Sequence, residues 1–163
     1  MLKDSIVSLT KYNLWANTKI LGFIIEAGEE KADVIQNSSF PSIRETLYHT
    51  WGAETIWINR LVDKPFTGWP GKNFKGTLSD AGELFLNTSK DFVVFAEGKN
   101  ETDFNSIITY KSTEGKEFSN SISQMVMHCM NHSTFHRGQI VTLLRNAGFT
   151  HLSSTDYITF CRL

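Results

Sequence analysis

Residues 128–139 read HCMNHSTFHRGQ, and this stretch contains three of the five histidines of the chain. It lies within the run 119–147, which has no proline, a single glycine and apolar residues at helical spacing. His128, His132 and His136 stand four residues apart, so on a helix they share one face and neighbouring side chains meet. Two imidazoles at this spacing can bind one metal ion, which lies about 2.0–2.1 Å from each nitrogen.

The geometry of a helix limits which of these histidines can act together. His128 and His136 are roughly 12 Å apart along the axis at about 1.5 Å per residue, so one ion cannot bind all three. His132 and His136 point toward the apolar stripe of the helix, whereas His128 lies toward its edge. A metal site at His132 and His136 and a pair of core histidines with local hydrogen bonds both fit this pattern. The stripe comprises Ile122, Met125, Val126, Cys129, Ser133, Ile140, Leu143, Leu144 and Ala147.

Length and charge restrict the class of protein. With 163 residues and a formal net charge of −1, residues 1–163 are expected to form a single domain with a substantial core. The basic residues are scattered, which argues against nucleic acid binding, and no apolar run approaches the ~20 residues of a membrane span. The N-terminus does not resemble a secretory signal, and two cysteines, Cys129 and Cys161, do not make a disulfide framework. We therefore expect a soluble, cytoplasmic protein that binds neither nucleic acid nor membranes.

Four segments carry the 3.6-residue period of amphipathic helices. They are expected to cover residues 4–27, 42–62, 77–97 and 119–147. Residues 104–118 have β-propensity around a turn signal, which predicts a short β-hairpin or an extended loop before the last helix. The pattern therefore predicts an all-α protein built as a four-helix bundle, in which metal sites are formed by side chains of facing helices.

The segments at the helix ends carry further signals. Ser42 with Glu45 fits a capping box, Thr77 or Ser79 suits the start of the third helix, and Ser119 suits the start of the fourth. The loop 64–76 is rich in glycine, proline and aromatic residues. It is interpreted either as the lid or wall of a pocket or as a crossover held by its own aromatics. The tail after residue 148 is expected to cover one end of the bundle.

Several other side chains need an explanation. Glu54 falls on the apolar stripe of the second helix, where a carboxylate needs a hydrogen-bonding partner or a place at the boundary. His49 lies well off that stripe, a position typical of a surface histidine. In the first helix, Trp15 is interpreted as a core residue and Asn17 as a surface residue.

Three motifs together carry a family resemblance: residues 12–17 (YNLWAN), Leu47-Tyr48-His49 with Glu54 and Trp57, and residues 131–139 (NHSTFHRGQ) followed by Leu143-Leu144-Arg145 and Gly148. The chain resembles the DinB-like family, within the DinB/YfiT-like superfamily of metal-dependent enzymes, over nearly its whole length. The resemblance implies an up-down-down-up bundle and a divalent metal ion held by His49, His132 and His136, which replaces the surface interpretation of His49. It also implies a pocket or supporting role for His128.

The resemblance also defines the expected function. Family relatives include transferases and isomerases that use low-molecular-weight thiols, which implies a metal-dependent thiol S-transferase or hydrolase acting on a small-molecule thiol or electrophile. The alternatives are a non-catalytic, metal-containing, stress-related binding protein and a structural bundle with incidental histidines. Three imidazoles favour zinc or nickel as the metal, with iron, cobalt and manganese as further candidates. Family members commonly form a homodimer, for which the first and third helices would supply the surface.

The sequence alone does not assign a catalytic residue. Glu54 and His128 have the chemistry of a general base, and Tyr48 could donate a hydrogen bond to an oxyanion or be a boundary residue. Cys129 is either a thiolate close to the metal or a small core residue. Arg137 is expected to bind a carboxylate or phosphate of a substrate, or to pair with a neighbour on its helix.

Overall fold

Four long helices account for most of the computed structural model, which describes residues 1–163. They are α1 (Leu2–Ala27), α3 (Ile43–Leu61), α4 (Leu78–Glu97) and α5 (Ile122–Asn146). The expected all-α class and the four expected long helices are therefore confirmed. The remaining elements are short: α2 (Glu29–Ala32), η1 (Asp103–Asn105), β1 (Ile107–Lys111), β2 (Glu117–Ser121) and α6 (Tyr157–Phe160).

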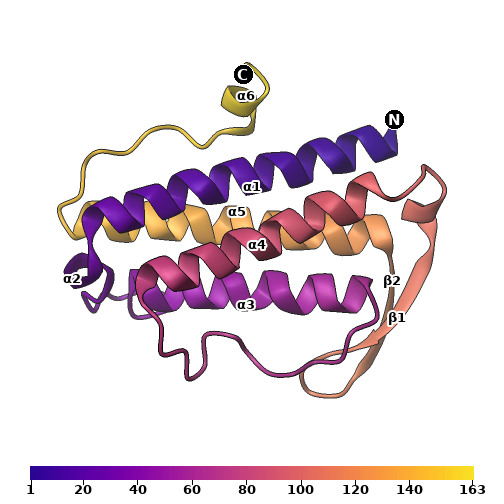
Figure 1. The fold of residues 1–163 in the computed structure, drawn as a ribbon, viewed down its shortest axis with the longest axis horizontal. Helices are drawn as coiled ribbons and strands as arrows, with labels where there is room; N and C mark the ends of the chain where they lie inside the picture. The colour runs from indigo at the N-terminus through magenta and orange to yellow at the C-terminus, as the bar shows by residue number, and fades with distance from the viewer.

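The long helices run up, down, down and up (Figure 1). Both α1 and α3 pack on α4 and α5, so α1 and α3 lie diagonally across the bundle. The connection from α3 to α4 returns along the length of the bundle, and α4 therefore runs parallel to α3 (Figure 1). The expected up-down-down-up four-helix bundle is the observed arrangement. Measured by length and apolar character, none of the helices could cross a bilayer.

The segment before α5 is the predicted β-hairpin. Strands β1 and β2 pair antiparallel, with Thr109 opposite Ser119. Because β2 extends to Ser121, α5 begins at Ile122, and the Ser121 hydroxyl caps it by accepting a hydrogen bond from the Gln124 N–H at 3.2 Å. The prediction that Ser119 caps this helix is wrong, since a local cap preference carries no information about pairing with another strand.

The predicted starts of α3 and α4 are confirmed. Thr77 caps α4 in a complete capping box with Asp80. The Ser42 hydroxyl caps α3 by accepting a hydrogen bond from the Glu45 N–H at 3.2 Å. The Glu45 carboxylate does not bond back to Ser42, so only half of the predicted capping box forms and this carboxylate remains free.

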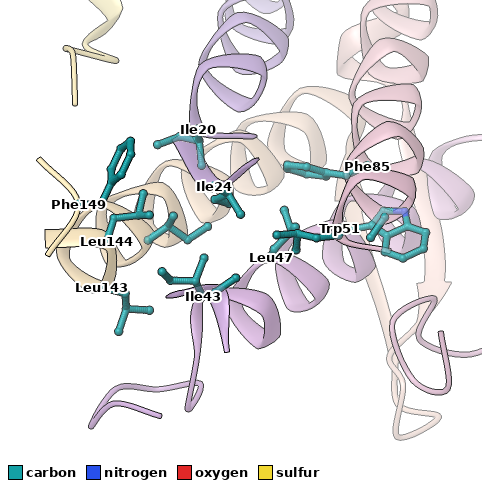
Figure 2. Packing of buried hydrophobic residues seen from close by; sticks show 13 residues of the cluster. Ile20, Ile24, Ile43, Leu47, Trp51, Phe85, Leu143, Leu144 and Phe149 are labelled. Atoms are coloured by element: carbon teal, nitrogen blue, oxygen red, sulfur yellow. The ribbon is translucent and has the colours of Figure 1, made fainter. Parts of the chain in front are cut away.

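Two apolar clusters fill the bundle, one toward each end. The first joins the end of α1 to the start of α3 and the end of α5, and it includes Ile24, Leu47 and Leu144 (Figure 2). The second joins the start of α1 to the end of α3 and the start of α5, and it includes Ile6 and Phe92. Along each long helix, buried polar side chains lie between the two clusters. We call this level of the bundle the polar layer; it comprises Asn13, Asn17, Glu54, Ser89, Ser133 and Arg137.

Two glycines fix the crossover between α3 and α4 against the bundle. A Cβ at Gly52 would lie 2.4 Å from the Trp69 ring, and a Cβ at Gly71 would lie 2.6 Å from Tyr48 Cβ. Backbone and aromatic ring therefore approach each other at distances that only glycine permits. The loop is thus a crossover held by its own aromatics, and Trp69 also lines a cavity beside His49.

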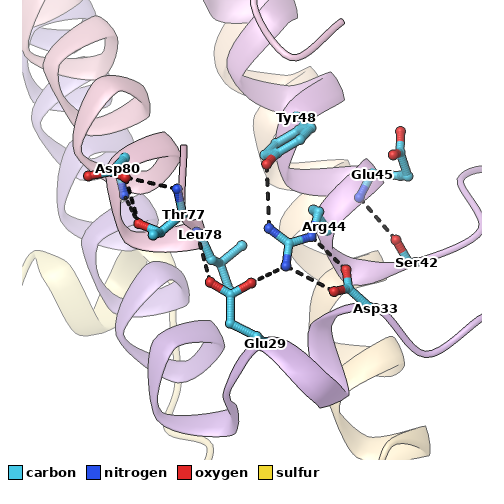
Figure 3. A network of polar contacts seen from close by, with 9 residues as sticks. All are labelled: Glu29, Asp33, Ser42, Arg44, Glu45, Tyr48, Thr77, Leu78 and Asp80. Atoms are coloured by element: carbon cyan, nitrogen blue, oxygen red, sulfur yellow. Dashed lines mark hydrogen bonds and ion pairs between the residues drawn. The ribbon is translucent and has the colours of Figure 1, made fainter. Parts of the chain in front are cut away.

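Arg44 ties the start of α3 to the connections around it (Figure 3). Its guanidinium bonds the carboxylates of Glu29 and Asp33, and it donates a hydrogen bond to the Tyr48 hydroxyl at 3.4 Å. Glu29 in turn accepts a hydrogen bond from the backbone N–H of Leu78 at 3.0 Å, at the first residue of α4. The network therefore holds the starts of two long helices together at one end of the bundle.

The chain after α5 turns back along α1 (Figure 1). Phe149 packs into the first apolar cluster, and Leu152 packs against the same cluster. The Tyr12 hydroxyl donates a hydrogen bond to the Thr155 carbonyl at 2.9 Å, and the rings of Trp15 and Phe160 lie 5.8 Å apart. The start of the tail thus covers one end of the bundle, as expected, and its remainder covers the outer side of α1. Trp15 is half-buried beneath the tail, so the prediction that it is a core residue is wrong.

Candidate metal site

His49, His132 and His136 come together although they are far apart in the sequence. His49 lies on α3 and the other two on α5, and these helices pack directly on each other. The Nε2 atoms of His49 and His132 are 3.2 Å apart, and those of His132 and His136 are 3.0 Å apart. One ligand atom from each residue lies within 4.8 Å of the other two. The interpretation of His49 as a surface residue is therefore wrong, because this side of α3 faces α5.

The geometry of this three-histidine cluster fits a single metal ion. Two nitrogens bound tetrahedrally to one ion at about 2.0–2.1 Å are roughly 3.3 Å apart, close to the observed spacing. His136 Nδ1 lies 2.7 Å from the Gln139 Oε1 acceptor, so Nδ1 carries the proton and Nε2 presents a lone pair. By contrast, His132 Nδ1 is buried without a hydrogen-bonding partner. The cluster could hold a cation between its converging lone pairs, with Gln139 orienting one of the rings.

Burial keeps the three imidazoles neutral. Burial lowers the pKa of His49 to about 4, and the nearby His136 acts in the same direction. Burial likewise lowers the pKa of His132 to about 4, and the nearby His136 and His49 act in the same direction. Burial also lowers the pKa of His136. At neutral pH the rings are therefore unprotonated, which is the form in which histidine binds a metal ion.

Aromatic side chains and one carboxylate surround His49. Phe40 and Trp69 stack on its ring, with centroids 4.2 and 5.4 Å away. Together with Glu45 and Tyr48 they line a cavity of about 390 Å³ that His49 shares. Sequence reasoning considered Glu45 only as part of a helix cap. Its position four residues before His49, on the same face of the helix, is the signal that could have identified it.

Glu54 lies at the centre of the polar layer, and three other helices supply its partners. Its side chain is fully buried. The carboxylate accepts hydrogen bonds from Asn13 and Asn17 of α1 at 2.8 and 2.9 Å, from Ser133 of α5 at 2.7 Å and from Ser89 of α4 at 2.6 Å. The prediction that Asn17 is a surface residue is thus wrong. Sequence reasoning assigned no role to Ser89, whose only signal is a hydroxyl on an apolar face.

Arg137 also belongs to the polar layer. Its Nη1 donates hydrogen bonds to the Oδ1 atoms of Asn13 and Asn17 at 2.5 and 2.8 Å, and its Nη2 donates to the Thr134 hydroxyl at 2.6 Å. The same two asparagines donate their amide N–H groups to Glu54, so they connect the guanidinium to the carboxylate. Arg137 therefore pairs with side chains of the protein, among them Thr134 on its own helix, and does not point its guanidinium at a substrate.

Three further candidates take different positions. Cys129 is fully buried in the second apolar cluster, and burial raises the pKa of its thiol, so it is a core residue rather than a thiolate near the histidines. The Tyr48 hydroxyl accepts a hydrogen bond at the start of α3, and its ring supports the crossover. His128 lies outside the cluster, with its ring centroid 6.2 Å from that of His132 and 4.7 Å from that of Trp57.

Fold and site together define a class of protein: an up-down-down-up helix bundle with three histidines, from two facing helices, placed to share one cation. The model of the DinB family matches residues 1–162. The chain therefore belongs to the DinB family, as its sequence motifs predict.

Two individual proteins illustrate the relationship. Protein DinB from Bacillus subtilis (strain 168) is 26% identical over an alignment of 163 positions, which covers 96% of this chain and 93% of the relative. The crystal structure of a DinB-like protein from Bacillus cereus ATCC 10987 superposes with a TM-score of 0.69 at 17% identity. The superposition covers 88% of this chain and 91% of the other, and it shows that the two proteins share a fold.

Proposed function

We propose that this chain is a metal-dependent enzyme in which His49, His132 and His136 hold one divalent ion. Zinc or nickel is favoured, with iron, cobalt and manganese as further candidates. The observation that carries the proposal is the convergence of three imidazole Nε2 atoms at separations of 3.0 and 3.2 Å. No Asp, Glu or Cys joins the three histidines in this cluster. Three protein ligands with an open fourth position are the donor set of catalytic rather than structural zinc sites.

The reaction class that fits this site is attack of a small-molecule thiol, or of water, on an electrophile. A bound ion would lower the pKa of the thiol or water and so supply a nucleophile near neutral pH. The chain's own residues support this chemistry. Gln139 orients His136, Phe40 and Trp69 cover the ring of His49, and Glu45 is the carboxylate that lines the cavity beside it. The proposal is therefore a thiol S-transferase or a hydrolase, with Glu45 as the candidate proton acceptor.

A second candidate is a non-catalytic, metal-containing, stress-related binding protein. The observation that favours it is the state of Glu54, the general base considered from the sequence. Its carboxylate already accepts four hydrogen bonds inside the polar layer and does not reach the three-histidine cluster's ligand set. On this alternative the protein binds an ion and small thiols, but a broad screen of thiols and electrophiles shows no turnover.

Elemental analysis of untagged protein, paired with a thiol-transfer assay, tests these candidates. We expect close to one divalent ion per chain in the wild type and almost none in His136→Ala, because removing one of three ligands dismantles the site. The matched control is His151→Ala, which alters an exposed histidine paired with Glu26. Turnover of glutathione with 1-chloro-2,4-dinitrobenzene should fall together with the ion. Loss of the ion without loss of turnover would refute the enzyme mechanism, and full occupancy without any turnover would favour the binding protein.

Homodimer formation and a cytoplasmic location stay predictions. Light scattering coupled to size-exclusion chromatography measures the molar mass directly, and a value near twice the 18.5 kDa of the chain would support the dimer. A monomer at micromolar concentration would contradict it.

A further inference from the structure

A cavity of about 500 Å³ lies beside the three-histidine cluster, between the hairpin, α3 and α5. His128 connects the two regions, because it lines the cavity and its ring centroid is 6.2 Å from that of His132. This volume accommodates a small organic molecule. The lining includes Trp57, Arg60, Tyr110, Phe118, Gln124 and His128.

Arg60 gives the cavity a fixed positive charge. Its guanidinium lies over the rings of Trp57 and Tyr110, 4.6 and 4.8 Å from their centroids. Its Nη2 donates a hydrogen bond to the Lys111 carbonyl at 3.1 Å, which leaves the other N–H groups without a protein acceptor. No carboxylate of the chain forms an ion pair with Arg60. A planar guanidinium held in this way is suited to bind a carboxylate through two parallel hydrogen bonds.

The other groups around the cavity favour the same kind of ligand. Gln124 Oε1 already accepts a hydrogen bond from the Ser121 N–H at 3.0 Å, so its amide N–H groups remain to be donated. His128 has no hydrogen-bonding partner in the protein, and Phe118 adds apolar surface. No aspartate or glutamate lines the cavity. Its charge and its aromatic walls therefore favour an anion with an apolar body over a cation.

We propose that this cavity binds the electrophilic substrate, and that the substrate is a small organic carboxylate with an aromatic or other apolar body. The carboxylate bonds to Arg60, and the apolar body packs against Trp57, Tyr110 and Phe118. The far end of the molecule then extends past His128 toward the histidine cluster. The reaction that this binding serves rests on the proposed function, whereas the binding itself needs only Arg60 and the aromatic walls.

Phenylacetate and its neutral amide, phenylacetamide, test this inference because they differ in charge but hardly in shape. Calorimetric titration of full-length protein treated with EDTA should show phenylacetate binding at least about tenfold more tightly, since charge-assisted hydrogen bonds are the stronger ones. Arg60→Gln should lose this preference. The control is Lys64→Gln, which removes a positive charge outside the cavity and should keep it. The comparison of two probes on the wild type stands even where a variant fails to fold.

Three results would overturn the inference. They are equal binding of the two probes by the wild type, an unchanged preference in Arg60→Gln, and binding of phenylacetate only when metal is present. The last result would place the anion on the ion instead of on Arg60. The inference and the proposed function can fail separately. If protein that holds no metal shows an Arg60-dependent preference for phenylacetate, carboxylate binding in the cavity is supported but the proposed function is not. If turnover depends on metal but neither probe is preferred, only the inference about the cavity is refuted.

Discussion

Replacing Ser133 with alanine would remove one hydrogen bond from the buried carboxylate of Glu54 while the rest of the polar layer stays in place. The Ser133 hydroxyl is fully buried and donates to Glu54 at 2.7 Å. A hydrogen bond to a charged group contributes about 1.5–3 kcal/mol, and three donors to the carboxylate remain. We therefore expect the free energy of unfolding to fall by about 2 kcal/mol. For a chain of this length, the thermal midpoint would fall by about 4–8 °C.

Urea unfolding followed by circular dichroism measures this change, and EDTA in the buffer removes the contribution of bound metal. The control is Thr142→Ala on the same helix, which removes an exposed hydroxyl that donates to the Gly138 carbonyl at 3.1 Å. It should change the free energy of unfolding by less than about 0.5 kcal/mol. An equally small effect of Ser133→Ala, at an unchanged m-value, would refute the reasoning, because the carboxylate would then not depend on its donors.

Three further predictions concern the site, the crossover and the acid range. Gln139→Leu should weaken metal binding about 10–100-fold, because the His136 ring loses its orienting hydrogen bond. Titration against a chelator measures the metal affinity, and an unchanged affinity would contradict the orienting role of Gln139. Gly52→Ala should displace Trp69, whose ring lies 2.4 Å from the added Cβ, and cost about 1–3 kcal/mol. Tryptophan fluorescence and urea unfolding report the two effects, and an unchanged emission spectrum would argue against the displacement. The hydrogen bond from Arg44 lowers the pKa of Asp33, so the Arg44–Asp33 pair stabilises the folded protein. This stabilisation is complete above the pKa of about 4 that Asp33 has in the unfolded chain, and it is lost as the pH falls through the lower pKa of the folded state. The stability difference between wild type and Arg44→Met should therefore shrink below about pH 4, and a constant difference down to about pH 2 would disprove the assignment.

Helix periodicity and cap residues predicted the four long helices because both signals are local. Thr77 and Ser42 begin their helices as expected, since a hydroxyl before an amphipathic segment needs no distant partner to act as a cap. The start of α5 could not be obtained in this way. Whether Ser119 belongs to a strand or to a helix cap depends on its pairing with Thr109, ten residues earlier.

His49 shows why the site was only partly predictable. A helical wheel measures distance from a single stripe, but α3 packs against both α4 and α5, and His49 faces the second of these. The pair on α5 was visible in the sequence because its spacing is local. The third member required the family motif. The prediction that Asn17 is a surface residue failed for a related reason. A sequence shows that a side chain is polar, but not that a buried carboxylate lies opposite it.

Under the proposed function, the hairpin would act in the selection of a ligand and not in the binding of the ion. It contributes Tyr110 and Phe118 to the wall of the larger cavity, yet it adds little to the core, and Phe118 is 41% exposed. The three histidines lie on helices that the polar layer holds together. Substitutions in the hairpin would therefore reshape the cavity at a small cost in folding free energy and leave the histidines in place. Under the same proposal, the molecules that the cavity accepts could change while His49, His132 and His136 keep their places.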